Sequence, residues 1–268
     1  MAVDIGGTKT LVAVFTPEGE VVESQKFRTP QVYEEFKQEL AANVAKLSTN
    51  NFLGGAIGMP GQVDRALGIS ISAGPNLQWS NSPLAADLQS LINAPAAIEN
   101  DANLAGLSEA LLVKETYRKT LYITLSTGIG GGYVIDGLLD LNTLDAEVGH
   151  MIFERDGTFR TWESFASGKA IVAKYGKRAS EIEDTTIWEE ISLNIAIGII
   201  NVSAVLTPDV IIIGGGVGAH LEKFINPLNK KLAELKPGSL KLPAVIQAGR
   251  PEEAVIYGCY ELAKQQSR

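Results

Sequence analysis

The chain has 268 residues, of which 45% are hydrophobic and 20% are charged, so it can bury a substantial core. Its formal net charge of −8 offers no long-range attraction to nucleic acid, and we expect no nucleic-acid partner. The single cysteine, Cys259, excludes an intrachain disulfide and every multi-cysteine zinc site. Together with the absence of a signal-peptide pattern it predicts a reducing, cytoplasmic setting.

The first predicted element is a hairpin. An apolar strand over residues 2–5 enters a Gly6-Gly7 turn and leaves as a second apolar strand ending at Phe15. Residues 21–27 alternate as an edge strand does, and residues 33–47 carry apolar side chains at helical spacing. These patterns predict a sheet covered by helices.

The rest of the chain alternates strand and helix patterns. We predict strands over 54–61, 97–101, a second hairpin over 121–135 and a strand over 210–213, with helices over 102–114, 187–206 and 252–265. Polar residues and glycines interrupt the most apolar run, 191–217, which predicts a buried helix and strand rather than a membrane span, and we expect no membrane partner. The alternation predicts the α/β class.

The first hairpin turn carries groups that suit phosphate. Gly6 and Gly7 expose backbone N–H groups, Thr8 and Lys9 can reach phosphate oxygens, and Asp4 can hold Mg²⁺ directly or through water. The alternative is a plain hairpin with a Gly-Gly turn, and the spacing does not match a P-loop.

Two later glycine segments suggest further ligand contacts. Residues 126–132 place four glycines in five positions, which weakens a strand unless a ligand or another backbone comes close; a bulged hairpin is the alternative. Residues 214–219 formally match a dinucleotide pattern after a buried strand, but too little chain follows for a Rossmann half, so a nucleoside seat fits better.

Polar residues elsewhere suggest an acceptor site. Asp101 could take the proton of a substrate hydroxyl that Asn100 orients, or the pair could simply cap the following helix, and both can hold at once. Glu147 and His150, three apart, can bind neighbouring hydroxyls of a polyol, although a surface turn is the alternative. Glu163 begins a helix by pattern and is by itself a first-turn acid.

Taken in order, these motifs resemble the ROK family of sugar kinases and repressors, within the actin, hexokinase and heat-shock ATPase superfamily. The resemblance covers nearly the whole chain. The matching segments are Asp4-Ile-Gly-Gly-Thr-Lys9, Gly58-Met-Pro-Gly61, Asn100-Asp101, Ser126 to Gly132, Glu147-x-Gly-His150 and Ile212 to Gly218. They are similar to the family's first phosphate motif, sugar-side turn, catalytic pair, second phosphate motif, sugar signature and adenosine motif.

The resemblance implies a two-lobed, actin-like (ribonuclease H-like) fold with a cleft between the lobes. The charged interval 114–119 predicts the junction between an N-terminal lobe over 1–115 and a C-terminal lobe over 116–251. The resemblance implies that a last helix, 252–268, packs back on the first lobe. Relatives are frequently homodimers, which implies a homodimer here.

The resemblance also implies roles for particular residues. Asp101 would be the catalytic base. The residues implied to contact the sugar are Gly61, Asn76, Asn100, Asp101, Glu147, His150 and Glu163. Those implied to contact ATP or its Mg²⁺ are Asp4, Gly6, Gly7, Thr8, Lys9, Thr127, Gly128, Gly130, Gly215 and Gly216.

Two departures from the family pattern stand out. Where relatives carry zinc-binding cysteines, this chain has Glu154, Asp156 and Thr161, so we expect no structural zinc. Hydrogen bonds or packing by Trp162 must then fix His150. Residues 144–146 also lack a glycine that relatives often carry before Glu147, which could reshape the sugar pocket.

The sequence thus predicts an enzyme, a kinase that transfers a phosphoryl group from Mg-ATP to a sugar hydroxyl, with the 6-hydroxyl of glucose as the first expectation. N-acetylmannosamine or N-acetylglucosamine kinase is the nearest alternative, and polyphosphate is an alternative donor. From other classes, a sugar-responsive ROK regulator would carry a helix-turn-helix before the first strand, and a non-catalytic sugar-binding protein would not need Asp101.

Overall fold

The computed structural model describes residues 1–74, 77–155 and 157–266. Contacts divide the chain into two compact units, one formed by Met1–Ser108 with the segment from Glu253 onward and the other by Glu109–Glu252. The division falls inside helix α3 (Asp101–Val113), earlier along the chain than the boundary after residue 115 that the sequence suggested.

The first unit is built on a five-stranded sheet in the order β3-β2-β1-β4-β7. β1 is antiparallel to β2 and parallel to β4, which is parallel to β7. The predicted first hairpin and edge strand are confirmed. The elements are β1 (Ala2–Ile5), β2 (Lys9–Phe15), β3 (Val21–Arg28), β4 (Gly55–Met59), β7 (Ala96–Asn100), the small hairpin β5 (Gln62–Asp64) and β6 (Ile69–Ser72), and helices α1 (Tyr33–Val44), α2 (Leu84–Ile92) and α9 (Ala254–Gln266).

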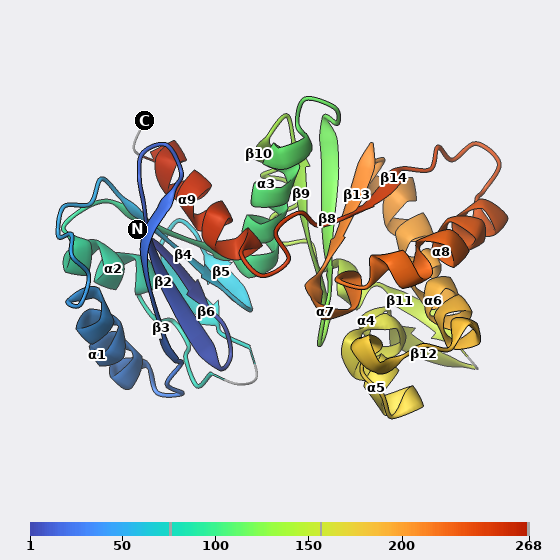
Figure 1. Cartoon of the computed structure of the whole chain (residues 1–268), viewed down its shortest axis with the longest axis horizontal. Coiled ribbons are helices and arrows are strands. Elements are labelled where there is room, and N and C mark those ends of the chain that lie inside the picture. The colour runs from blue at the N-terminus through green and yellow to red at the C-terminus, as the bar shows by residue number, and fades with distance from the viewer. Residues whose placement is uncertain (75–76, 156, 267–268) are drawn as a thin grey trace. The chain divides into compact units, whose positions relative to one another are not determined.

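Strand alternation gives this sheet two buried faces. One face carries large side chains such as Ile5, Ile57 and Met59, which pack with residues of α1 and α2. The other carries alanines, which leave room for α9 and the start of α3. A Cβ at Gly58 would lie 2.6 Å from Cγ1 of Val255, so α9 rests directly on the strand backbone. Within this unit, Figure 1 shows α1 and α2 on one side of the sheet and α9 on the other.

The second unit has a five-stranded sheet in the order β10-β9-β8-β13-β14. β8 and β9 form the second predicted hairpin, and β13 runs parallel to β8 and β14. Its strands are β8 (Lys119–Leu125), β9 (Ile129–Ile135), β10 (Leu138–Leu139), β13 (Val210–Gly214) and β14 (Ala244–Gln247), with a separate hairpin of β11 (Ile152–Arg155) and β12 (Thr158–Thr161). Its helices are η1 (Val148–His150), α4 (Glu163–Ala166), α5 (Gly168–Tyr175), η2 (Ala179–Glu181), α6 (Thr185–Leu206), α7 (Gly215–Gly218) and α8 (Leu221–Leu235).

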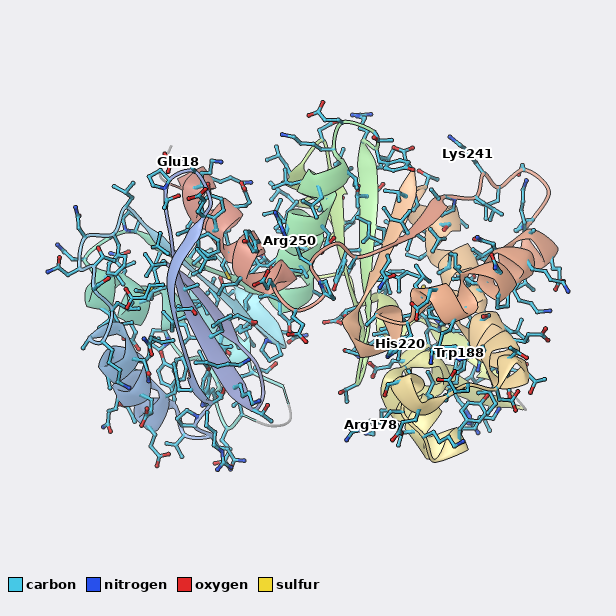
Figure 2. The ribbon with its side chains drawn as sticks, viewed as in Figure 1. Glu18, Arg178, Trp188, His220, Lys241 and Arg250 are labelled. Atoms are coloured by element: carbon cyan, nitrogen blue, oxygen red, sulfur yellow. The ribbon has the colours of Figure 1, made fainter. Side chains whose placement is uncertain are left out.

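Helices α6 and α8 pack together and form the apolar core of this unit with the sheet. Figure 2 labels Trp188 on α6, and its ring stacks on that of Phe224 of α8 at 5.2 Å between centroids. Within the described ranges, α6 is the one helix long and apolar enough to cross a membrane, and 56% of its most apolar window is buried inside the protein. α6 therefore has the burial of a core helix, as the interrupted apolar pattern predicts.

Candidate functional site

Parallel pairing gathers the candidate residues of the first unit at one edge of its sheet. The register pairs Asp4 with Gly58, and Met59 with Asn100, so the carboxyl ends of β1, β4 and β7 meet there. Ligand-binding loops of α/β proteins occupy such an edge. The first glycine turn, the turn at Gly61 and the start of α3 are thereby brought together.

Asp4 lies in an unfavourable place for a charge. Burial and, to a lesser extent, the negative charge of Asp101 together raise the pKa of Asp4 from 3.8 to about 7, and Lys26 opposes this shift. The two carboxylates are therefore close enough to interact. Carboxylate oxygens are hard ligands, so this donor set fits Mg²⁺, which would relieve the repulsion.

Two buried threonines hold the first glycine turn. The Thr29 hydroxyl donates to the Gly6 carbonyl at 2.8 Å, and its oxygen lies 2.9 Å from that of Thr10. Because the Thr29 proton is used on Gly6, Thr10 donates to Thr29. The Gly6 N–H is occupied by the Lys9 carbonyl at 2.9 Å. Thr8 and Lys9 are exposed, and their side chains are accessible to a phosphate.

Asn100 acts as a cap and as a brace. Its Oδ1 accepts from the Ala102 N–H at 2.9 Å, and its Nδ2 donates to the Gly61 carbonyl at 3.1 Å. Asp101 Oδ1 also accepts from the Ala102 N–H, at 2.8 Å. Gly61 has φ +89°, and a Cβ there would overlap the Ser72 carbonyl, so only glycine fits. The cap reading of this pair is confirmed.

A buried ion pair beneath Asn100 was not anticipated from the sequence. Arg65 binds Glu99 through Nε–Oε2 and Nη2–Oε1, both 2.6 Å. Glu99 Oε1 also accepts from the Asn100 N–H at 2.7 Å and from Asn103 Nδ2 at 2.9 Å. The Glu99 side chain is only 4% exposed. A signal for it is present in the sequence, because Glu99 follows Ala97 and Ile98 in a predicted strand, and a glutamate buried there requires a partner.

The second unit gathers its glycine segments in the same way. β13 is parallel to β8 with Gly214 opposite Thr124, so the loops after both strands share an edge. Gly215 has φ +79°, and a Cβ there would lie 2.6 Å from the Leu125 carbonyl oxygen. A Cβ at Gly216, by contrast, would meet nothing within 4 Å. Gly216 thus faces open space at the edge where a nucleoside is expected.

Two glycines of the second loop are required by contacts within the protein. A Cβ at Gly128 would lie 2.7 Å from Glu163 Oε2, and one at Gly131 would lie 2.9 Å from Val148 Cγ2. The loop is closed by Ser126, whose N–H donates to the Gly128 carbonyl at 3.0 Å. Thr127 is exposed and Gly130 is half-buried. Close packing therefore explains part of the glycine pattern without a phosphate.

The predicted sugar residues of this unit lie against the same loop. Glu163 Oε2 accepts from the Ile129 N–H at 3.3 Å, and its Oε1 lies 3.7 Å from His150 Nε2. A Cβ at Gly149 would overlap the Ile129 carbonyl, so η1 packs tightly there. The side chains of His150 and Glu163 are 59% and 35% exposed, and Glu147 is exposed. A ligand can reach all three.

Within each unit, the candidate residues come together as follows. The first unit gathers Asp4, Gly6, Gly7, Thr8, Lys9, Gly61, Asn100 and Asp101, and the second gathers Thr127, Gly128, Gly130, Glu147, His150, Glu163, Gly215 and Gly216. Asn76, predicted to line the sugar pocket, lies outside the described residues.

The segment after His150 does not suit structural zinc. Glu154 is used by the turn of its own hairpin, where Oε1 accepts from the Gly157 N–H at 2.7 Å. Thr161 is no zinc ligand, and Asp156 lies outside the described residues. Among the residues that are described, no three His, Cys, Asp or Glu side chains group to hold a metal ion. The donor set, without a thiolate, does not fit tetrahedral zinc.

Comparison with known proteins agrees with the motif order. A glucokinase of Streptomyces coelicolor is 26% identical over 99% of this chain and 97% of its own length, and an N-acetylmannosamine kinase of Vibrio cholerae is 28% identical over 97% and 98%. The solved ROK glucokinase of Streptomyces griseus, in complex with glucose and AMPPNP, superposes with a TM-score of 0.80 at 27% identity, covering 98% of each chain. The fold expected from the resemblance is confirmed by this likeness. The model of the ROK family matches residues 1–266, and the chain belongs to that family.

Proposed function

We propose that this protein is a sugar kinase that transfers a phosphoryl group from Mg-ATP to a hexose hydroxyl, with the 6-hydroxyl of glucose as the first candidate. The observation that carries the proposal is the carboxylate pair of Asp4 and Asp101 at the carboxyl edge of the first sheet, with Asp101 fixed at the start of α3. The glucokinases among the relatives support the choice of sugar.

Each group of residues has a defined part in this reaction. Asp101 accepts the proton of the attacking hydroxyl, and Asn100 orients that hydroxyl. Glu147, His150 and Glu163 bind sugar hydroxyls. Thr8, Lys9 and Thr127 bind phosphate oxygens together with N–H groups of the glycine turns other than that of Gly6, which donates to the Lys9 carbonyl. Asp4 would hold Mg²⁺, which when bound neutralises phosphate charge. Alignment and charge stabilisation supply most of the acceleration.

A second candidate acceptor is N-acetylmannosamine, favoured by the 28% identity to the Vibrio cholerae enzyme. A non-catalytic sugar-binding protein is less favoured, because Asp101 is present at the start of α3. A regulator is less favoured, because the relatives named above are sugar kinases. We further propose a cytoplasmic protein that assembles as a homodimer, and light scattering on the purified chain tests the assembly.

A panel of acceptors and donors tests the proposed function. Purified protein is assayed with glucose, mannose, fructose, N-acetylglucosamine and N-acetylmannosamine, each against Mg-ATP and polyphosphate, with product measured directly. We expect ATP with glucose to give the highest kcat/KM. If no acceptor–donor pair gives a phosphorylated product while calorimetry shows that a sugar binds, the protein is instead a non-catalytic sugar-binding protein.

A further inference from the structure

Trp162, which directly precedes Glu163, is completely buried. Its indole Nε1 donates to the Asn194 carbonyl on α6 at 3.0 Å. Beneath the ring, α6 carries Gly198, and a Cβ there would overlap the indole carbons. The indole therefore lies against the helix backbone, in a place that exists only because residue 198 has no side chain.

The Asn194 side chain, on α6, forms hydrogen bonds with the β11–β12 hairpin, which precedes Trp162, and with α4, which follows it. Its Oδ1 accepts from Arg155 Nη2 at 2.9 Å, which anchors the β11–β12 hairpin. Its Nδ2 donates to the Phe165 carbonyl at 3.3 Å, which anchors α4. The Arg155 guanidinium also lies 4.7 Å from the Phe165 ring centroid. One residue thus ties the hairpin before Trp162 and the helix after it.

Trp162 connects in turn to the segments that carry two ionisable residues of the predicted sugar group, His150 and Glu163. Its backbone N–H donates to the carbonyl of Met151, the residue after His150, at 2.8 Å. On the other side it is the N-cap residue of α4, of which Glu163 is the first residue. A shift of the indole on α6 would therefore move Glu163 relative to His150 and to the Ile129 N–H.

We propose that Trp162, seated on α6 by Asn194 and Gly198, is a positioning residue that sets the placement of Glu163 against His150 and thereby the affinity for the sugar. The proposal rests on the proposed function for its ligand, but not for its geometry. In this proposal, contacts of Trp162 within the protein hold His150 in place, at a position where the sequence predicts no zinc to do so.

Trp162→Phe and Trp188→Phe form a matched pair. Trp188 is also buried in this unit, and its Nε1 donates to the Ile182 carbonyl at 3.1 Å, so each variant loses one indole hydrogen bond from the same core. Trp188 lies six residues before Asn194, about 9 Å along α6. Trp162→Phe should raise the KM for the sugar about tenfold with kcat and the KM for ATP little changed, and Trp188→Phe should change none of them.

A double-mutant cycle separates positioning from general loosening. If Trp162 acts through Glu163, its effect on sugar affinity should fall to about twofold or less once Glu163 is replaced in Glu163→Gln. Full additivity of the two changes would overturn the proposal, as would an equal loss in Trp188→Phe. Asn194→Asp, which keeps the acceptor for Arg155 but not the donor to Phe165, gives a second route if Trp162→Phe does not fold.

Hydrogen exchange tests the geometry without any substrate. Trp162→Phe should speed exchange of the Ile129 amide, which donates to Glu163, relative to wild type and to Trp188→Phe. Unchanged exchange there would overturn the positioning role even if the enzyme were active. Faster exchange in a protein that phosphorylates none of the sugars would uphold the geometry and reject the proposed function.

Discussion

The two groups of candidate residues are held by different physical means. In the first unit, the Arg65–Glu99 ion pair and the hydroxyls of Thr10 and Thr29 hold the segments that carry Asn100 and the first glycine turn. In the second unit, close contacts at glycines and the buried Trp162 hold the segments that carry His150 and Glu163.

The difference predicts how each group fails. A buried charge that loses its partner is strongly destabilising, and a Cβ added where a side chain packs closely against a glycine is destabilising through overlap of atoms. The ion pair of the first group should therefore be sensitive to the removal of side-chain atoms, whereas the glycine contacts, most of them in the second group, should be sensitive to their addition. The variants below test this contrast, in order of expected effect.

Asp101→Asn should have the largest effect on turnover. The amide keeps the size of the side chain but cannot take a proton, and loss of a general base lowers kcat by about 10³-fold. Calorimetry should show sugar binding within a few fold of wild type. Asp136→Asn, an exposed aspartate paired with exposed Arg118, is the matched control and should leave turnover unchanged. Near-normal turnover in Asp101→Asn would remove Asp101 from its role.

Arg65→Leu should have the largest effect on stability. It leaves the Glu99 carboxylate, 4% exposed, without its bidentate partner, and such losses cost about 3 kcal/mol in the free energy of unfolding. Denaturant unfolding measures it. Arg118→Leu breaks an ion pair whose side chains are 66% and 57% exposed, and should leave that free energy unchanged within error. Equal losses in both variants would contradict a buried network beneath Asn100.

Much of this architecture follows from local sequence pattern. The large apolar residues Val3 and Ile5, which alternate with Ala2 and Asp4, predict the strand β1, and the apolar 187–206 pattern predicts α6. The site residues follow from motifs placed where strands end. The domain boundary predicted from the sequence, after residue 115, differs from the structural boundary inside α3. The apolar pattern of a helix predicts the helix but does not show with which of two hydrophobic cores each turn packs.

The contacts that hold the site are non-local, and local pattern does not predict them. Arg65 and Glu99 are 34 residues apart, and Trp162 and Asn194 are 32 apart. From the sequence alone, Gly198 inside α6 only weakens the helix prediction, because glycine has a low helix propensity. The structure shows that the Trp162 indole packs where a side chain at residue 198 would lie. Such pairs depend on tertiary placement, which one sequence does not contain.

Asp4→Asn should make the ligand-free protein less sensitive to pH. Because burial raises the pKa of Asp4 to about 7, the folded protein keeps a proton that the unfolded chain loses above 3.8. This contribution to stability is fully present below 3.8 and is lost as the pH rises to about 7. The free energy of unfolding of Asp4→Asn minus wild type should therefore grow by about 3 kcal/mol from about pH 5 to about pH 8.

Magnesium provides the control for this titration. Adding Mg²⁺ at pH 8 should stabilise wild type more than Asp4→Asn, since a bound cation offsets the carboxylate repulsion. If the difference in the free energy of unfolding between the two proteins is constant with pH, the pKa of Asp4 is not raised in the folded protein. Equal stabilisation by Mg²⁺ would remove Asp4 as its ligand.

Gly216→Ala should have the smallest effect and should act on ligand binding alone. A Cβ at residue 216 meets nothing within 4 Å and α7 accepts alanine, so the melting temperature should not change. If the open space beside Gly216 receives the nucleoside, the methyl group should raise the KM for ATP about tenfold and leave that for the sugar alone. Gly238→Ala, where a Cβ also meets nothing, should change neither KM. In contrast, Gly215→Ala should lower the melting temperature, because its φ of +79° and the nearby Leu125 carbonyl exclude a side chain. An unchanged KM for ATP in Gly216→Ala would mean that the open space beside Gly216 receives no nucleoside and that glycine at this position serves only the turn.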